Sequence, residues 1–376
     1  YLGIGEGFTI AMGWEKGIIP PPTAWQKFWW NLNLKENWVY LIPPLILIFM
    51  IFRWRSKGRD PRVREAVTVM YEPPKFEGKY LSPGEAGTLV DERMDQRDIT
   101  ASVISLAVKG YIKIEEVKVE GLISLLDRTD YKLLKVKKTD DGLDAFERQL
   151  FDDIFAGHGE SIMISEMKNE FYKKISGLKK TVYKQLVDKK YFPANPEKIM
   201  AKYMVWGFLI IIFGAFLSFL FLPFAPWKGI ISFGLSGLII LLFARAMPVK
   251  TRTGALAGMD IRGFQEFLRR ADKDRLERMP EKDLFYKYLP YAMALDVVDN
   301  WAEAFKDIYQ EPPQWFVASH GLTRFNTKSF AHSLRTATAA MGSTMYSAPR
   351  GSGTSRGGGG GGFSGGGGGG GGGGSW

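Results

Sequence analysis

Cysteine is absent from the 376 residues of this chain, and histidine occurs only three times. Without cysteine, the chain cannot form a disulfide framework, a thiolate zinc site, an iron–sulfur cluster or a cysteine nucleophile. No two of His158, His320 and His332 have the i, i+4 spacing with which a helix presents a pair of metal ligands. We therefore predict no catalytic, cofactor-binding or metal-binding residues, and we expect a protein that is not an enzyme.

Charged residues are missing from three long apolar segments, residues 38–52, 203–224 and 229–244. A helix needs roughly 20 residues to cross a hydrocarbon core about 30 Å thick, and flanking Trp, Lys and Arg residues can anchor a shorter one. We predict transmembrane helices at residues 38–54, 203–224 and 228–245 of a multi-pass cell-membrane protein in a lipid bilayer. The alternative for the last two is a buried hairpin of a water-soluble protein, and the lack of a polar face argues against it.

Lys and Arg are distributed unevenly around these segments. Six basic residues and one acidic residue, Asp60, lie between Arg53 and Arg64, whereas the loop of residues 222–228 contains one basic residue. Cytoplasmic loops carry the excess of Lys and Arg, so we predict that the N-terminus is outside and the C-terminus cytoplasmic. The same rule accounts for the formal net charge of +10, which is therefore weak evidence for nucleic-acid binding.

The residues before the first span are expected to lie outside the cell. Residues 1–22 are interpreted as the end of an external β domain, with a strand over residues 7–14. Residues 23–37 place Trp25, Phe28, Trp29 and Leu32 at helical spacing. That spacing predicts an amphipathic helix in the outer membrane interface.

Residues 55–200 show local helix and strand signals. Ser82-Pro-Gly-Glu85 combines a hydroxyl N-cap, proline at the first helical position and the Glu of a capping box. A second helix is predicted to begin behind Asp98 as its N-cap and to stop at Gly110. Alternating apolar residues then predict a short β ribbon. Two helices and a ribbon are the outline of a winged helix, so we predict cytoplasmic α+β winged-helix-like modules here.

A weaker repeat of this pattern follows. Residues 146–155 are predicted to be helical, and Ser165 is predicted to cap a long, lysine-rich helix. Its end, Gln185-Leu-Val-Asp-Lys-Lys-Tyr-Phe192, parallels Ser105-Leu-Ala-Val-Lys-Gly-Tyr-Ile112, which indicates two related modules in tandem. Its lysines suit either a solvated face or an anionic leaflet, where each is worth about 1 kcal/mol.

The last part of the chain changes in composition. Residues 249–316 are expected to form a cytoplasmic helical region that packs against the first module, with an amphipathic helix over residues 263–278. Ser, Thr, Ala and finally Gly dominate residues 317–376. Such a segment buries too little apolar surface to offset its ordering entropy, so we predict a disordered tail.

One acidic pattern has the spacing of cation ligands on a helix. Asp91, Asp95 and Asp98 are spaced i, i+4, i+7, which would suit a cation. A solvent-facing acidic stripe is the simpler explanation.

Several segments share one family pattern. They are Gly58-Arg-Asp-Pro61, Tyr71-Glu-Pro-Pro74, Leu81-Ser-Pro-Gly-Glu-Ala-Gly87, Asp98-Ile-Thr-Ala-Ser-Val-Ile-Ser-Leu-Ala-Val-Lys-Gly-Tyr-Ile112 and Lys287-Tyr-Leu-Pro-Tyr-Ala-Met-Ala-Leu295, with a glycine-rich end. Together they resemble the predicted membrane proteins grouped as domain of unknown function 2207, up to about Phe316. The resemblance implies the topology above and an external β domain of which this chain retains the end. It implies no enzyme activity and no site residues.

Two functions fit this organisation. The first is a protein-interaction or scaffolding component that links an external domain to the cytoplasmic modules and binds other membrane or cytoplasmic proteins. The alternative is a membrane-anchored DNA-binding regulator. The outward positions of its recognition helix would be Ser102, Ser105 and Lys109, with no Arg or Asn to read bases, so nucleic acid is the less favoured partner.

Overall fold

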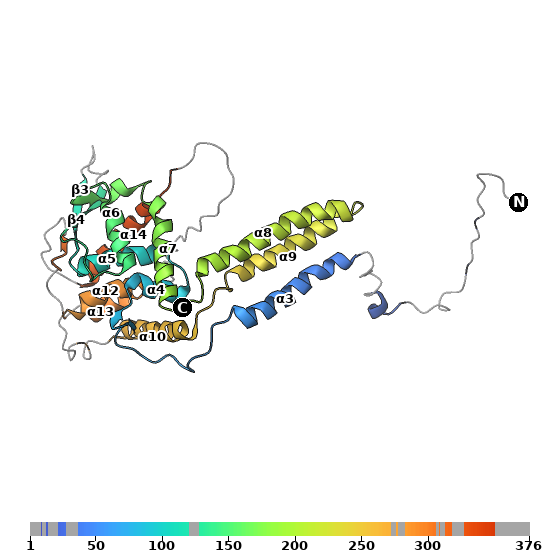
Figure 1. The fold of residues 1–376 in the computed structure, drawn as a ribbon, viewed down its shortest axis with the longest axis horizontal. Coiled ribbons are helices and arrows are strands. Elements are labelled where there is room, and N and C mark those ends of the chain that lie inside the picture. Colours follow the sequence, from blue (N-terminus) through green and yellow to red (C-terminus); the bar gives the residue numbers. More distant parts are fainter. Residues whose placement is uncertain are drawn as a thin grey trace, which may run out of the picture.

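A computed structural model describes residues 9, 13, 22–27, 37–119, 128–271, 276, 283–305, 308, 313–317 and 327–349. Figure 1 shows a rod of long helices attached to a mixed α/β part. We call that part the head domain; it consists of the described residues within 60–194 and 250–349. The predicted strand over residues 7–14 and most of the interfacial helix lie outside the described residues, although residues 24–27 are helical.

Among the described residues, three helices are long and apolar enough to cross a membrane, and they lie close to the predicted spans. The 3-10 helix η1 (Trp38–Leu41) continues into α3 (Ile42–Lys57), and α8 (Pro196–Phe221) and α9 (Pro226–Ala244) form a hairpin. Helix α8 begins before residue 203, where the apolar run starts, because the side-chain amide oxygen of Asn195 accepts the Glu197 and Lys198 N–H groups.

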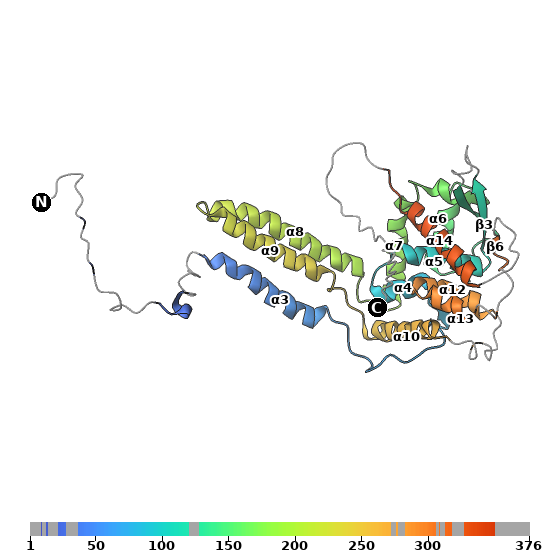
Figure 2. The same ribbon diagram turned by 180° about the vertical axis from the view of Figure 1, so that it is seen from behind.

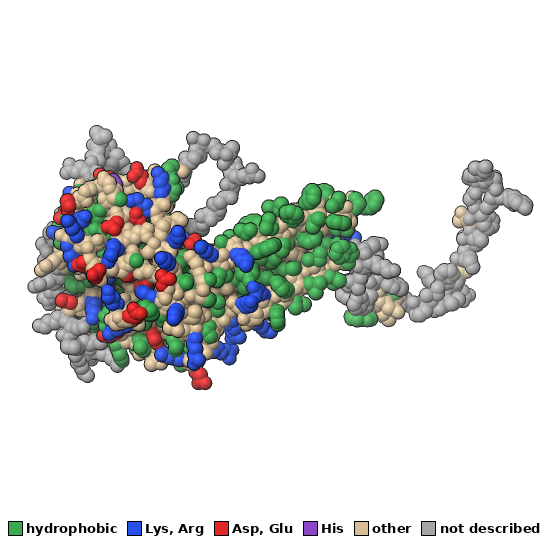
Figure 3. All heavy atoms as spheres, viewed as in Figure 1, with side chains coloured by type: hydrophobic (Ala, Val, Ile, Leu, Met, Phe, Trp, Pro, Cys, Tyr) green, Lys and Arg blue, Asp and Glu red, His purple; other side chains and the backbone are tan. Residues whose placement is uncertain are grey.

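Small residues lie between the membrane helices and large ones face outward. Helix α9 lies between α3 and α8 in both views (Figures 1 and 2). A Cβ atom on Gly237 would lie 2.7 Å from the Gly207 carbonyl oxygen, so the α8 and α9 backbones are in close contact there. Phe213 and Phe221 are exposed, and Figure 3 shows this rod covered with apolar side chains. Small residues at this contact allow the two membrane helices to pack closely.

The head domain combines helices with two small sheets. Its helices are α4 (Pro83–Asp91), α5 (Gln96–Val108), α6 (Ala145–Phe155), α7 (Tyr172–Asp188), α10 (Arg252–Arg269), α12 (Leu284–Ala294), α13 (Val298–Ala304), α14 (Thr327–Met345) and the 3-10 helix η3 (Ile164–Met167). Its strands are β1 (Lys75–Phe76), β2 (Lys79–Tyr80), β3 (Ile112–Val119), β4 (Arg128–Lys135), β5 (Ser161–Met163) and β6 (Phe316–Val317).

The larger sheet joins segments that are distant in sequence. Its strand order is β5-β4-β3-β6, and the predicted ribbon is the antiparallel pair β3–β4, with Ile114 opposite Leu133. Strand β6 adds parallel to β3, with Phe316 opposite Ile114. The prediction that residues 249–316 are entirely helical is therefore wrong at their end, because the apolar Phe316 pairs with β3 at the edge of the sheet.

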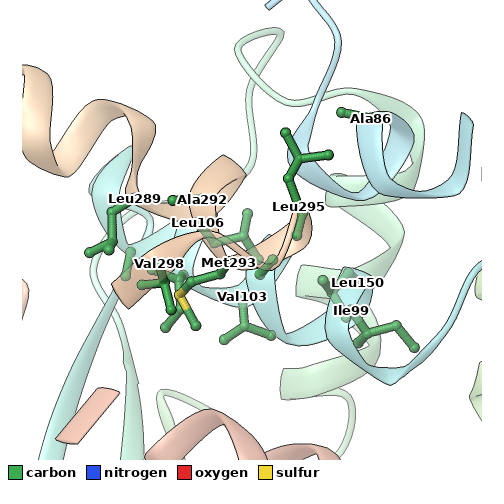
Figure 4. Packing of buried hydrophobic residues seen from close by; sticks show 14 of the residues in the cluster. Ala86, Ile99, Val103, Leu106, Leu150, Leu289, Ala292, Met293, Leu295 and Val298 are labelled. Carbon is green, nitrogen blue, oxygen red and sulfur yellow. The ribbon is translucent and has the colours of Figure 1, made fainter. Parts of the chain in front are cut away.

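One hydrophobic core runs through the head domain. It contains side chains from Leu81 to Met345, so the predicted packing of the region after α9 against the first module is confirmed. Helix α5 lies at its centre, and every residue from Asp98 to Ala107 is buried. Figure 4 shows Val103 of α5 beside Met293 of α12. Trp301 on α13 is fully buried, and its indole N–H donates to the Phe285 carbonyl at 3.1 Å.

The prediction that all of residues 317–376 are disordered is wrong for α14. This helix packs on α5 and α13 and buries Phe330, Leu334 and Met341. Composition misled the prediction because the apolar residues are few but recur on one face among Ala, Ser and Thr. The glycine run after residue 349 lies outside the described residues.

Three predicted helix starts are also wrong. Asp95, not Asp98, is the N-cap of α5, since its carboxylate accepts the Arg97 N–H at 3.0 Å. Ser165 does not cap the lysine-rich helix α7: it lies within the 3-10 helix η3, and α7 begins at Tyr172. Helix α10 starts eleven residues before residue 263, because Thr251 caps it by accepting the Gly254 N–H.

Candidate binding cleft

Two helix pairs, α4–α5 and α6–α7, end in the same way. After α5, the Gly110 N–H donates to the Ala107 carbonyl and the Tyr111 N–H to the Leu106 carbonyl, each at 2.9 Å. After α7, Lys190 and Tyr191 make the equivalent bonds at 2.9 Å. Both ends are Schellman motifs with a left-handed residue, Gly110 (φ +76°) or Lys190 (φ +61°). The predicted parallel between the two modules is confirmed at these ends.

The two pairs also begin in the same way. Glu85 lies in the first turn of α4 and accepts the Ser82 N–H at 3.1 Å. Glu147 lies at the same position in α6, and its carboxylate accepts the Asp144 N–H. In return, the Asp144 carboxylate accepts the Glu147 N–H at 2.7 Å. Each Glu therefore forms part of a capping box and fixes the N-terminus of its helix.

Each pair supplies a lysine to the other pair. Lys109, at the end of α5, donates to both carboxylate oxygens of Glu147 at 2.6 Å, and Lys189, at the end of α7, pairs with Glu85. The two carboxylates are fully buried, with exposed fractions of 0% for Glu85 and 1% for Glu147. The Ser105 hydroxyl also donates to Glu147 at 3.0 Å. A buried carboxylate needs such partners, so these ion pairs fix the two helix pairs against each other.

Burial governs the electrostatics of this region. It raises the pKa of Glu85 and of Glu147, and the nearby Asp144 charge adds to the effect while the paired lysine opposes it. Burial and the carboxylates of Glu147 and Glu85 also raise the pKa of Tyr291 well above its usual value. The Tyr291 hydroxyl donates to the Leu81 carbonyl at 2.6 Å.

An open cleft of about 1220 Å³ lies over this ionic cluster. Its walls are the β1–β2 hairpin, the N-terminal ends of α4 and α6, the C-terminal ends of α5 and α7, and one face of α12. Glu77 and Gly78 both have positive φ, as a two-residue type I′ hairpin requires. Lys79 donates to the Asp141 carbonyl at 3.2 Å and connects the hairpin to the loop before α6.

The cleft presents aromatic rings and charges of both signs. Its lining includes the half-buried Tyr80, Tyr286 and Trp315. Lysine ammonium groups lie against several of its rings. That of Lys287 is 5.7 Å from the Tyr80 centroid and 5.4 Å from the Tyr288 centroid, and that of Lys189 is 5.8 Å from the Phe76 centroid. Its charged lining residues are Glu77, Lys79, Lys109, Asp141, Asp144, Glu147, Lys189, Asp283 and Lys287. Such a surface suits a chain with both apolar and charged groups.

The structure changes the interpretation of two predicted patterns. Ser102 and Ser105 are buried, so the prediction that they face outward on a recognition helix is wrong. The predicted solvent-facing acidic stripe is wrong for Asp98, which is buried between α4 and α5. A Cβ atom on Gly87 would lie 1.9 Å from an Asp98 carboxylate oxygen, and desolvation raises the Asp98 pKa well above its usual value.

No cleft residue was predicted as a site residue. Local signals marked part of it, since the capping box of Glu85 was recognised and Asp144 with Glu147 repeats the same pattern. The repeat also aligned Lys109 with Lys189. The contact of each lysine with the opposite helix pair has no local signal, because 104 positions separate Lys189 from Glu85.

Comparison with protein families matches residues 71–305 to the C-terminal domain of a predicted membrane protein, DUF2207. The matched range includes both helix pairs, the membrane helices α8 and α9, and α12, whereas α3 and α14 lie outside it. No curated protein and no solved structure matches the chain.

Proposed function

We propose that this chain, which belongs to the DUF2207 family of predicted membrane proteins, is a membrane-anchored adaptor. Its membrane helices hold the head domain at the bilayer, and the cleft binds a segment of a partner protein. The observation that carries this proposal is the size and lining of the cleft. Small-molecule pockets occupy roughly 300–1,000 Å³. An open cleft of about 1220 Å³ with aromatic and charged walls is better suited to a polypeptide.

The aromatic lining supports a protein ligand. Tyr and Trp are enriched at the centres of protein interfaces, where a large ring contributes contact area at a low entropic cost. The proposal assigns no chemical step to the cleft, since Glu85 and Glu147 are each engaged by a lysine.

Site-specific photocrosslinking tests the adaptor proposal in native membranes. A photoreactive side chain in place of Lys79, on the exposed cleft wall, should give a defined protein adduct. Ala145→Trp should abolish that adduct, because Ala145 is exposed and lines the cleft. Asp152→Trp is the matched control: it lies two turns further along α6, is exposed, and is not among the cleft-lining residues. An adduct that survives Ala145→Trp, or is lost equally in both variants, contradicts the proposal.

The adaptor proposal also includes an orientation, with the head domain in the cytoplasm and the N-terminus outside. Basic residues form a collar at the ends of the membrane helices that face the head domain, and this collar supports the orientation. At the opposite ends, the described residues 37–41 and 222–228 contain a single basic residue, Lys228. We define the basic collar as Arg53, Arg55, Lys57, Lys198, Lys202 and Arg245.

Single introduced cysteines test this orientation cleanly, because the chain has none of its own. In intact cells, a membrane-impermeant maleimide should label Phe224→Cys, in the exposed loop between α8 and α9. Ala271→Cys, after α10, should be labelled only when the cells are opened. The reverse pattern would place the head domain outside.

The DNA-binding alternative loses support from the burial of α5. A helix buried from Asp98 to Ala107 can enter a major groove only if α12 and α14 move away from it. We expect no shift of duplex DNA by the full-length protein at low salt. A shift that weakens with salt, at a log–log slope of about −0.9 per phosphate contact, would revive this function.

A further inference from the structure

A small pocket lies where the chain passes from the membrane helices into the head domain. It has a volume of about 180 Å³, and we call it the junction pocket. Its charged lining residues are Asp60, Arg62, Arg64, Lys250 and Arg262, and its remaining lining comes from Pro61, Val63, Val90, Ala255, Gly258 and Met259. It is separate from the cleft, with which it shares no lining residue.

The junction pocket lies close to the membrane helices along the chain. Asp60 is three residues beyond the end of α3, and Lys250 is six residues beyond the end of α9. The Lys250 N–H donates to the Asp60 carboxylate at 2.7 Å. The two exits also touch at Gly58, where a Cβ atom would lie 3.1 Å from the Ala246 carbonyl oxygen. The headgroup layer is roughly 5–8 Å thick on each side of the hydrocarbon core. Lining residues only three to six positions beyond the membrane helices therefore place the pocket next to this layer.

Two of the four cations in this region are already engaged. Lys250 is buried and pairs with Asp60 and with Glu92. Arg64 pairs with Asp260 at 2.5 Å. These three ion pairs stabilise the shape of the pocket, and the Glu92 carboxylate also attracts the Arg262 guanidinium group electrostatically.

Arg62 and Arg262 are the other two cations. Both are exposed and line the pocket, Arg62 on the segment after α3 and Arg262 on α10. Neither makes an ion pair with a described residue within 4.0 Å. A guanidinium group binds phosphate oxygens in a bidentate manner, and two guanidinium groups lining one pocket favour a phosphate group over a simple counterion.

We propose that the junction pocket binds the phosphate group of an anionic membrane lipid through Arg62 and Arg262. The lipid is preferred to a soluble phosphate because the pocket adjoins the headgroup layer and the basic collar, which raises the local concentration of anionic lipid. The bound headgroup would connect the segment after α3 with α10 and so hold the head domain in a fixed position at the bilayer surface.

Lipid titration of the full-length protein in neutral detergent tests this proposal. Short-chain phosphatidylglycerol should raise the thermal unfolding midpoint saturably, whereas the matched phosphatidylcholine should not. The double variant Arg62→Gln/Arg262→Gln removes both guanidinium groups. It should need about tenfold more phosphatidylglycerol, or more, to reach half of the maximal rise in the unfolding midpoint. Its midpoint without lipid should stay near that of the wild type, because neither arginine has an ion pair with a described residue.

Two control variants remove the same charge elsewhere. Arg269→Gln/Arg270→Gln changes the C-terminal end of α10, and Arg55→Gln/Lys57→Gln changes the basic collar. Both should keep the lipid response within about twofold of the wild type. An equal loss in the collar variant means that the lipid binds the collar as a whole, and an equal response to inorganic phosphate means a site for free anions. Either result overturns the proposal, as does an unchanged response in the pocket variant.

Discussion

The two helix pairs of the head domain have the same ends and different surroundings. Both begin with a capping-box Glu and end in a Schellman motif followed by tyrosine. Helix α5 is nevertheless covered by α12 and α14, whereas α7 keeps Lys173, Lys180 and Lys184 exposed. The difference teaches that helix ends are built by local hydrogen bonds, which form in the same way in the core and at the surface. The residues between the ends decide where the helix lies.

The largest expected effect comes from breaking the exchange of lysines between the pairs. Lys189→Met leaves the fully buried Glu85 without its ammonium partner and should destabilise the protein by about 3 kcal/mol near pH 8. Lys109→Met should cost less, because Lys109 is 37% exposed and Ser105 still donates to Glu147. Thermal unfolding of the full-length protein in detergent measures both.

The pH dependence separates lost charge from lost packing. Burial already raises the pKa of Glu85, and loss of Lys189 raises it further. The folded state then binds a proton that the unfolded state has released, so stability falls as pH rises and the Lys189→Met deficit should shrink toward pH 5. The double variant Glu85→Gln/Lys189→Met should regain part of the loss at pH 8. A deficit that is equal at both pH values would show that Lys189 acts through packing alone.

A glycine in each pair tests how closely its surroundings approach. Gly87→Ala should destabilise the protein by about 1–3 kcal/mol, because the new Cβ atom would lie 1.9 Å from the buried Asp98 carboxylate. Gly177→Ala on α7 should instead stabilise it by about 0.5–1 kcal/mol, since its Cβ atom meets only the end of the flexible Gln149 side chain at 3.0 Å. If both variants shift the unfolding midpoint in the same direction, the surroundings of Gly87 and Gly177 do not differ in the way proposed here.

Each helix pair ends in a residue with left-handed backbone geometry, a glycine in one pair and a lysine in the other, and substitutions in opposite directions can be compared there. Gly110→Ala should cost about 1 kcal/mol, and Lys190→Gly should gain up to about 1 kcal/mol, because a side chain is strained at positive φ. The two shifts in unfolding midpoint should have opposite signs and similar size. If Lys190→Gly destabilises the protein, the Lys190 side chain makes a contact that offsets its backbone strain.

Asp98 belongs to the first pair alone and tests what it costs to bury a carboxyl group there. Its pKa is raised well above the usual value, chiefly by burial. The folded state therefore holds a proton that the unfolded chain loses at about pH 4, and stability falls as pH rises above that value. Asp98→Asn can still accept the Asp95 N–H but has no charge to bury, so its midpoint should exceed that of the wild type by more at pH 8 than at pH 4.5. A difference that does not change with pH would refute this.

Local patterns in the sequence predicted much of the fold. The membrane helices followed from uncharged apolar runs, and the α4 start followed from Ser82-Pro-Gly-Glu85. The start of α5 was misplaced by three residues because Asp95 and Asp98 are both part of one capping box and either can resemble the N-cap. The cleft was not predicted, because it exists only where the β1–β2 hairpin, α12 and the two helix pairs meet.

The sequence by itself determined which segments enter the membrane, where the helix pairs end and which residues can reverse the chain at positive φ. These properties depend on residues within a few positions of one another, so they can be recognised locally. Only the tertiary structure decided that Ser102 and Ser105 are buried, that α14 is ordered and that β6 extends the sheet. Burial and long-range pairing depend on which distant segments supply the covering surface, and the free energy of that packing has no counterpart in any local pattern.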